Sequence, residues 1–220
     1  MSGTLAGRIG IIGDVHAEDV LLETALTALS REGVERILCA GDIADGPGSV
    51  DRACAFLAEH RVATVRGNHD RWVLTDTMRD LPDAVPRAAL APKTLRYLHG
   101  LPTVLTFSSK WGRVLLCHGL GSNDMASVMP DDFGYALDSN TELQSLMTDR
   151  DTRIIINGHT HRPMLRSFGG LTIINAGTLF REHDPGYVIA DFEAGSVTWH
   201  GLARSETRVL GSLPPGLEGP

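Results

Sequence analysis

Gly67-Asn68-His69-Asp70 stands just after the apolar run at 62–65, which has the composition of a short buried strand. The glycine allows the chain to bend sharply at this point. The asparagine offers a neutral oxygen ligand, and a histidine beside an aspartate can act as a proton donor with its orienting group. The tetrapeptide alone is also compatible with an ordinary Asx turn. Whether this tetrapeptide belongs to a functional site or to an ordinary turn therefore depends on the other polar clusters of the chain.

Apolar runs and helical segments alternate over the first 65 residues. Runs at 9–12, 37–40 and 62–65 predict buried strands, and the apolar spacing at 22–29 and 49–59 predicts helices between them. Gly33 can end the first helix, and a Gly-Pro-Gly sequence at 46–48 breaks the chain before the second. This alternation predicts an α/β fold with parallel strands and right-handed crossovers.

The rest of the chain is richer in strands. The pattern loosens from 71 to 100, where Pro92 can open a short helix through Leu98. Residues 120–138 have no clear period and could form a loop over an active site, and Ser139-Asn140-Thr141-Glu142 has the form of a capping box. Further strands are expected at 103–107, 113–117, 153–156, 164–167, 171–174, 187–191 and 197–201. With no repeat or linker, we expect a single domain over residues 1–212 and a flexible tail at 213–220.

Length and composition restrict the classes of function. The chain has 220 residues, 42% hydrophobic and 21% charged, as a soluble globular domain does. No apolar run approaches the ~20 residues that cross a bilayer, and the N-terminus lacks a secretory signal pattern, so we expect no membrane association. Cys39, Cys54 and Cys117 lack CxxC spacing, which predicts buried thiols in a cytoplasmic protein. A net charge of −7 without a long Lys/Arg cluster makes nucleic acid an unlikely partner.

Five of the strand-like runs end in residues that can bind a metal or move a proton. These residues are Asp14 with His16, Asp42, Asn68 with His69 and Asp70, His118, and His159 with His161. Each cluster alone could be a turn or a hydrogen-bonded core histidine, but independent turns would rarely supply the whole ordered set. Since sites in α/β sheets form at the carboxyl ends of strands, the clusters can converge. Asp, Asn and His are oxygen and nitrogen ligands suited to Mn²⁺, Fe or Zn²⁺.

The charges of this set favour a phosphate ester as the substrate. Seven residues suffice for two divalent cations if one carboxylate bridges them. Two cations bring four positive charges, while Asp14, Asp42 and a bridging hydroxide bring three negative charges. The resulting centre has a net charge near +1 and attracts a phosphate ester.

In this order, Asp-x-His, Gly-Asp, Gly-Asn-His-Asp, His-Gly and Gly-His-Thr-His resemble the motifs of the calcineurin-like metallophosphoesterase superfamily. The resemblance extends from residue 14 to residue 161 and implies a four-layer α/β/β/α sandwich. It implies two divalent metal ions, with Mn²⁺ expected before Fe, Zn²⁺ or Ni²⁺. One metal would be held by Asp14, His16, Asp42 and His161, and the other by Asp42, Asn68, His118 and His159.

The same resemblance implies hydrolysis of a phosphate ester by a metal-activated hydroxide. His69 would face the substrate phosphate beside Asn68, and Asp70 would orient the His69 imidazole. Asn175-Ala176-Gly177-Thr178 resembles the Asn-Pro-Gly-Ser turn of the small bacterial and archaeal phosphodiesterases. Ile-Ala-Asp-Gly after Asp42 lacks the Asp-Arg-Gly of protein Ser/Thr phosphatases.

We therefore expect a phosphodiesterase or a nucleotide or dinucleoside polyphosphate hydrolase acting on a small substrate. One alternative is a phosphomonoesterase, including a protein Ser/Thr phosphatase, and another is a non-catalytic scaffold with this fold. Arg71 and Arg162 adjoin motif residues and, with Arg66 and Arg181, are candidates for holding a second phosphate or a leaving group; each could also be an ordinary surface charge. The histidines that match no motif are interpreted as surface or core residues, namely His60, His99, His183 and His200. The oligomeric state stays open.

Overall fold

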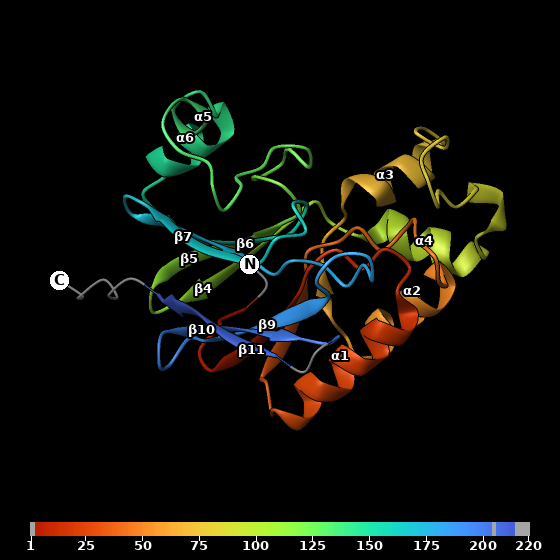
Figure 1. Cartoon of the computed structure of the whole chain (residues 1–220), viewed down its shortest axis with the longest axis horizontal. Helices are drawn as coiled ribbons and strands as arrows, with labels where there is room; N and C mark the ends of the chain where they lie inside the picture. The colour runs from red at the N-terminus through yellow and green to blue at the C-terminus, as the bar shows by residue number, and fades with distance from the viewer. Residues whose placement is uncertain (1–2, 204–205, 214–220) are drawn as a thin grey trace.

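The computed structural model of the chain describes residues 3–203 and 206–213 (Figure 1). Two β-sheets pack face to face, and helices cover the outer face of each sheet. The strand order is β11-β10-β9-β1-β2-β3 in the six-stranded sheet and β4-β5-β6-β8-β7 in the five-stranded sheet. This arrangement confirms the expected α/β/β/α layers.

The six-stranded sheet begins with the alternating strands and helices that the sequence predicts. Strands β1, β2 and β3 are parallel, and β9 joins the other side of β1 in the antiparallel direction. The strands of this sheet are β1 (Arg8–Ile12), β2 (Arg36–Cys39), β3 (Ala63–Thr64), β9 (Gly186–Asp191), β10 (Ser196–Gly201) and β11 (Thr207–Ser212). The helices on its outer side are α1 (Asp19–Arg31), α2 (Val50–Glu59), α3 (Asn68–Thr75) and α4 (Pro92–Gly100), with a 3₁₀ turn at Arg87–Ala89.

The five-stranded sheet combines two hairpins with a parallel centre. Strands β5, β6 and β8 run parallel, and β4 and β7 pair with them in the antiparallel direction. Its strands are β4 (Val104–Ser109), β5 (Gly112–Cys117), β6 (Thr152–Asn157), β7 (Met164–Phe168) and β8 (Leu171–Asn175). Helices α5 (Tyr135–Asp138) and α6 (Thr141–Thr148) lie over its outer face (Figure 1).

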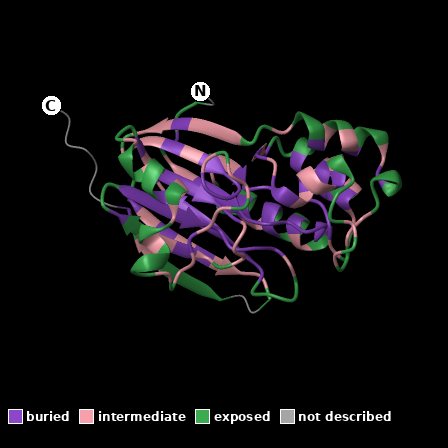
Figure 2. Ribbon diagram, turned by 90° about the horizontal axis from the view of Figure 1, so that it is seen from above, coloured by how far each residue is buried: buried purple, intermediate pink, exposed green. Residues whose placement is uncertain are grey.

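Side-chain alternation along the strands produces three apolar layers. Ile9 and Ile11 of β1 pack between the sheets, whereas Ile12 packs toward the helices of the six-stranded side. In β6, Ile154 and Ile156 point into the space between the sheets, and Ile155 points toward α6. Figure 2 shows buried residues along the central strands and exposed residues on the outer helices and loops. Because these strands are buried on both faces, they rigidly hold the loops at their carboxyl ends.

The local structure differs from the sequence prediction in four places. The capping box at 139–142 does not form, because Asn140 is the cap of α6 and accepts from the Leu143 amide, while the Ser139 hydroxyl donates to the Tyr135 carbonyl. Helix α3 begins inside the tetrapeptide that suggested a turn, and β11 adds an unexpected edge strand. Leu213 is buried between the sheets rather than part of a tail, and residues 214–220 lie outside the described residues.

Over residues 3–203 and 206–213, no helix is both long enough and apolar enough to cross a bilayer.

Candidate metal centre

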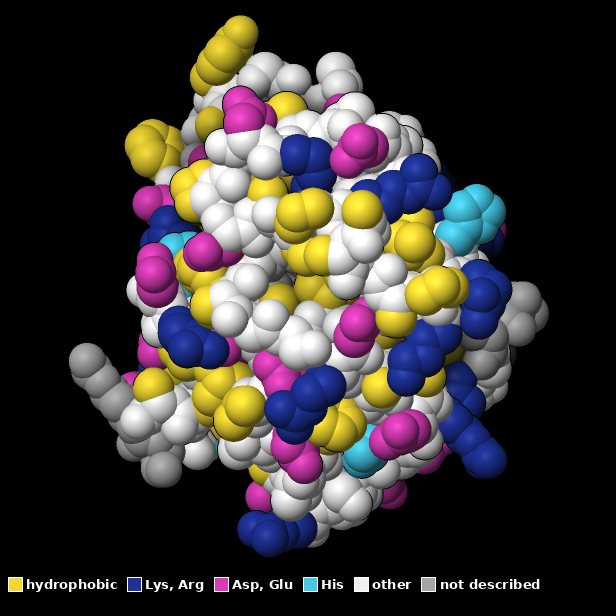
Figure 3. Space-filling model, turned by 90° about the vertical axis from the view of Figure 1, so that its right-hand side faces the viewer, with side chains coloured by type: hydrophobic (Ala, Val, Ile, Leu, Met, Phe, Trp, Pro, Cys, Tyr) yellow, Lys and Arg dark blue, Asp and Glu magenta, His cyan; other side chains and the backbone are white. Residues whose placement is uncertain are grey.

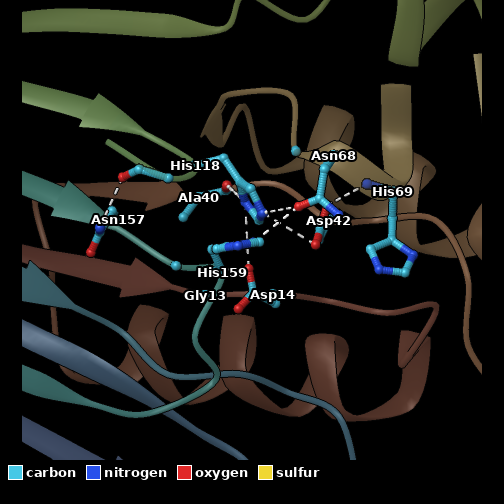
Figure 4. A network of polar contacts seen from close by, with 12 residues as sticks. Gly13, Asp14, Ala40, Asp42, Asn68, His69, His118, Asn157 and His159 are labelled. Carbon is cyan, nitrogen blue, oxygen red and sulfur yellow. Dashed lines mark hydrogen bonds and ion pairs between the residues drawn. The ribbon is translucent and has the colours of Figure 1, made fainter. Parts of the chain in front are cut away.

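The polar clusters predicted at the strand ends meet at one edge of the two sheets. Asp14 follows β1, Asp42 follows β2, and Asn68 is the first residue of α3 after β3. From the other sheet, His118 follows β5, and His159 and His161 follow β6. Figure 4 shows the side chains of Asp42, Asn68, His118 and His159 turned toward one another. The structure therefore brings all seven predicted metal-binding residues together, and their role as ligands remains a prediction.

A backbone amide from a neighbouring loop anchors each of the two carboxylates. The His69 amide donates to Asp42 Oδ1 over 2.8 Å, and the His159 amide donates to Asp14 Oδ1 over 2.9 Å. These loops approach closely because glycine precedes each motif: a Cβ on Gly67 would lie 2.1 Å from Asp42 Oδ1, and one on Gly158 would lie 2.5 Å from Asp14 Oδ1. The glycines leave both Oδ2 atoms free to face the histidines.

The first predicted ligand group lies around His16 and His161. Their Nε2 atoms face each other 2.9 Å apart, and His161 Nε2 lies 3.6 Å from Asp14 Oδ2. Asp42 Oδ2 lies 3.9 Å from His16 Nε2. These four side chains are buried or nearly so, which gives a cation a site shielded from water on the protein side.

The second predicted group lies around Asn68. Its Oδ1 atom is 2.8 Å from His118 Nε2 and 3.0 Å from His159 Nδ1. Asp42 Oδ2 is 3.2 Å from His118 Nε2, so this oxygen faces both groups. One ligand atom each from Asp42, His118 and His159 lies within 4.8 Å of the others, a spacing that a metal ion can span.

The histidine rings are oriented by contacts of their Nδ1 atoms. His16 Nδ1 donates to the Asp45 carbonyl over 3.1 Å, and His118 Nδ1 donates to the Ala40 carbonyl over 2.8 Å. Such bonds place the proton on Nδ1 and leave the Nε2 lone pair for a cation. His161 Nδ1 lies 2.7 Å from Nδ1 of His183, a histidine that the sequence assigned to no site. The ring orientations therefore suit metal binding.

The loops adopt strained backbone conformations where they present these residues. His16, Asp42, His159 and His161 all have positive φ angles, from 44° at His16 to 69° at His159. Residues with side chains rarely adopt such angles, and they concentrate at functional sites. The local strain turns these side chains toward the centre.

Burial and mutual repulsion shift the protonation of the centre. Burial raises the pKa of Asp14 to about 7, with the neighbouring Asp42 carboxylate adding to the effect. Burial alone would lower the pKa of His118, but the Asp42 and Asp14 carboxylates outweigh it and raise this pKa to about 10. Burial would likewise raise the pKa of Asp42, and His118 and His16 reverse that effect and hold it below its usual range. Protons on Asp14 and His118 thus offset negative charge that bound cations would otherwise offset.

One buried atom gives the most direct indication of what the centre can hold. Asp14 Oδ2 is buried and has no hydrogen-bond donor among the described residues, although an unpaired buried carboxylate oxygen is costly. It faces His161 Nε2, and the surrounding donors are carboxylate, amide and imidazole groups. This donor set is the one that Mn²⁺, Fe and Zn²⁺ accept. The residues present therefore fit divalent cations.

His69 stands beside the seven residues, and the sequence assigned its orientation to the wrong carboxylate. His69 Nδ1 bonds to Asp45 Oδ2 over 2.8 Å, and Asp45 is 3% exposed. Asp70 instead accepts from the backbone amides of Ile43, Ala44 and Gly67. Asp70 is the third residue of α3, and both of its carboxylate oxygens accept these backbone amides, so its side chain does not face the adjacent imidazole. Asp70 therefore fixes the loop that carries Asp42 rather than orienting His69.

Asp45 is in turn held by residues far along the chain. Arg79 Nη1 and Nη2 donate to its two oxygens over 2.8 and 2.9 Å, and the Val85 amide donates over 2.9 Å. His69 also offers a nitrogen within 4.8 Å of ligand atoms of His16 and Asp42. His69 also lines a cavity of about 270 Å³, so it is open to a substrate as well as close to the first ligand group.

Sequence comparison identifies the family to which this arrangement belongs. A model described as the calcineurin-like phosphoesterase superfamily domain matches residues 8–195. The chain belongs to this superfamily.

The relatives that these comparisons bring out share little sequence with the chain. The uncharacterized protein MJ0912 of Methanocaldococcus jannaschii is 22% identical over 188 residues, which cover 82% of this chain and 73% of MJ0912. A metallophosphoesterase structure from Sphaerobacter thermophilus superposes with a TM-score of 0.71 at 24% identity, covering 90% of this chain and 88% of that one. The structure of a putative diadenosine tetraphosphatase superposes with a TM-score of 0.62 at 20% identity, covering 91% and 97%. At these identities the superpositions establish the fold alone.

The turn at 175–178 supports the loop that carries His159 and His161. The Asn175 amide group donates to the Gly158 carbonyl over 2.6 Å, and Asn175 Oδ1 accepts from the Gly177 amide. The Thr178 hydroxyl donates to the Asp14 carbonyl over 2.9 Å. The turn therefore ties the β1 and β6 ends together without entering the metal centre.

The candidate arginines occupy different places. Arg71 forms a two-pronged ion pair with Asp124, at 2.6 and 2.8 Å, which ties α3 to the loop at 120–138. Arg181 pairs with the buried Glu18. Arg162 lines a cavity of about 530 Å³ next to His161. Arg66 has no polar side-chain contact that relates it to the centre, and its amide donates to the Pro102 carbonyl.

Asp45, Arg79 and His183 are the neighbours of the centre that sequence reasoning missed. Asp45 stands three residues after Asp42 and could have been found as a second acid in the same loop. Arg79 and His183 follow no strand and match no motif, so the chain carries no local signal for them.

Proposed function

We propose that this chain hydrolyses phosphate esters with two divalent cations, Mn²⁺ being the first choice. The observation that carries the proposal is the meeting of seven Asp, Asn and His side chains at one edge of the two sheets, among them Asp14, whose buried Oδ2 has no hydrogen-bond partner among the described residues. Asp14, His16, Asp42 and His161 would hold one cation. Asp42, Asn68, His118 and His159 would hold the other.

The cations, when bound, would supply Lewis-acid polarisation of the phosphate and a lowered pKa for a nearby water. The chain's own part in the reaction lies with His69. Its Nδ1 atom is engaged by Asp45, so Nε2 faces the substrate and can give a proton to the leaving oxygen. Asp45 holds the ring and stabilises its charged form, and Arg79 keeps Asp45 in place.

A phosphodiester, nucleotide or dinucleoside polyphosphate is the substrate class that the surroundings favour. Cavities of about 270 and 530 Å³ adjoin His161, enough for groups on both sides of a phosphate. On the face drawn in Figure 3, basic side chains are interspersed with acidic ones, which supports a small substrate over a nucleic acid backbone. The fold shared with a putative diadenosine tetraphosphatase agrees with this class. Three free, buried cysteines support a location in the reducing cytoplasm.

Hydrolysis of bis(p-nitrophenyl) phosphate tests the proposal. The protein is stripped with EDTA and reloaded with Mn²⁺, and His69→Ala is compared with His60→Ala, a change at an exposed helix end. We expect activity to return with Mn²⁺ and His60→Ala to match the wild type. His69→Ala should lower kcat by about 10²-fold on a phosphodiester with an alkyl leaving group, and by less on this aryl ester, because p-nitrophenolate leaves without a proton. A loaded wild-type protein without turnover of mono- or diesters would contradict the proposal and favour a non-catalytic scaffold. Loss of bound metal in His69→Ala would make His69 a ligand instead.

A further inference from the structure

Two cavities whose charged side chains differ meet at His161. The cavity of about 530 Å³ is lined by Arg162, Arg208 and His183, with Asp184 as its one acidic side chain among the described residues. The cavity of about 270 Å³ holds His16 and His69 and is lined by three acidic side chains, those of Asp45, Asp83 and Glu182. Even with Asp45 neutralised by Arg79, this second cavity keeps a negative charge. The first cavity therefore offers guanidinium donors that an anionic group of a substrate can bind, whereas the second offers carboxylates that repel one.

Both arginines of the larger cavity form surface ion pairs with carboxylates, which a phosphate group can replace. Arg208 lies over the ring of the buried Trp199, 4.1 Å from its centroid. It pairs with Asp184 at 2.5 Å and lies 3.5 Å from Glu206. Arg162 pairs with Asp131 at 2.9 Å. Both ion pairs are exposed on the two partners, so each contributes little to stability. A phosphate offers more acceptor oxygens in the same geometry and can replace the carboxylates.

We infer that the cavity formed by Arg162, His183 and Arg208 receives a second phosphoryl group of the substrate, on the side of the reacting phosphate away from the leaving group. The uncharged leaving group then lies in the acidic cavity beside His69. The inference rests on the proposed function and narrows the substrate to nucleotide-like esters that carry a further phosphate.

A matched pair of chromogenic substrates tests this inference. Thymidine 5′-(p-nitrophenyl phosphate) and its 3′-phosphorylated form share the leaving group and the nucleoside, and differ in one phosphate. The Mn²⁺-loaded wild type is expected to show the higher kcat/KM with the 3′-phosphorylated form. Since a hydrogen bond to a charged group contributes about 1.5–3 kcal/mol, Arg162→Ala and Arg208→Ala should each lower that preference by about tenfold or more. Arg113→Ala, which breaks a surface ion pair on β5, is the control and should keep the wild-type preference.

Several results separate the inference from the proposed function. A wild type that hydrolyses both substrates equally, or variants that keep the wild-type preference, would overturn the inference while the proposed function stands. Absence of p-nitrophenolate release from either substrate would overturn the proposed function. Arg208→Lys keeps the charge over Trp199, and a preference above that of Arg208→Ala would support the role of the cation rather than a folding defect. Diadenosine tetraphosphate serves as a third substrate. If Arg162→Ala and Arg208→Ala lose the same factor in kcat/KM with it, the second phosphate that the cavity binds belongs to a chain of phosphoanhydrides.

Discussion

Replacing Asp45 by Asn tests which carboxylate serves His69. The substitution keeps the volume of the side chain but removes the negative charge that faces His69 Nδ1 at 2.8 Å. It also removes the charge between the two guanidinium nitrogens of Arg79, whose side chain is 17% exposed. The imidazolium form of His69 then loses its counter-ion, and the ring loses its fixed orientation.

The expected loss in kcat follows from the role of His69 as proton donor. General acid catalysis contributes about 10²–10⁴-fold, so we expect Asp45→Asn to lower kcat by about 10²-fold with alkyl leaving groups. The loss should be smaller with p-nitrophenolate, which leaves without a proton. Because Asp45 and His69 act as one unit, the Asp45→Asn/His69→Ala double variant should be about as slow as His69→Ala. Metal content should stay at the wild-type value.

The assay measures the hydrolysis rate of a series of aryl and alkyl phosphodiesters under single-turnover conditions. Metal content is measured on the same samples. Asp76→Asn is the control, because Asp76 is exposed at the end of α3 and tolerates Asn at its left-handed φ of 56°. Wild-type kcat in Asp45→Asn, or losses in the double variant that multiply, would refute the assignment. So would a leaving-group dependence unchanged from the wild type.

Three further outcomes are expected around the cations. Asp42→Asn should release both metals, because Asp42 Oδ2 faces both ligand groups, and one metal retained at full occupancy by elemental analysis would contradict the shared role. Gly158→Ala should displace Asp14, since its Cβ would lie 2.5 Å from Asp14 Oδ1, and metal content should fall to about one ion per chain; two tightly bound ions would contradict this. Metal binding in a weak buffer should release more protons at pH 6 than at pH 8.5. At pH 6 both Asp14, with a pKa of about 7, and His118, with a pKa of about 10, hold protons, whereas at pH 8.5 Asp14 is already ionised; equal release would contradict these protonation states.

The sequence predicts most of the fold and the convergence of the seven residues because both depend on local patterns. Apolar runs of four or five residues mark the buried strands, and a polar residue after each strand necessarily lies at its carboxyl end. Edge strand β11 escapes prediction because its residues are mostly exposed, so the apolar pattern is weak there. Helix α3 escapes because Gly67, Asn68 and Asp70 are also turn residues.

The contacts around His69 could not be read from the sequence, because they join residues that no local pattern relates. Asp70 adjoins His69 in the chain, but the helical turn points its side chain at the backbone amides of 43, 44 and 67. Asp45 reaches the imidazole from another loop, and Arg79 comes from beyond α3. Side-chain direction, which depends on the local backbone, decides between the neighbouring acid and the distant one.

Anomalous diffraction at the manganese edge, from crystals grown with Mn²⁺, tests the central claim most directly. We expect two manganese peaks, one contacted by Asp14, His16, Asp42 and His161, and the other by Asp42, Asn68, His118 and His159. A single peak, or a peak bound by His69 in place of His161, would contradict the proposed binuclear centre.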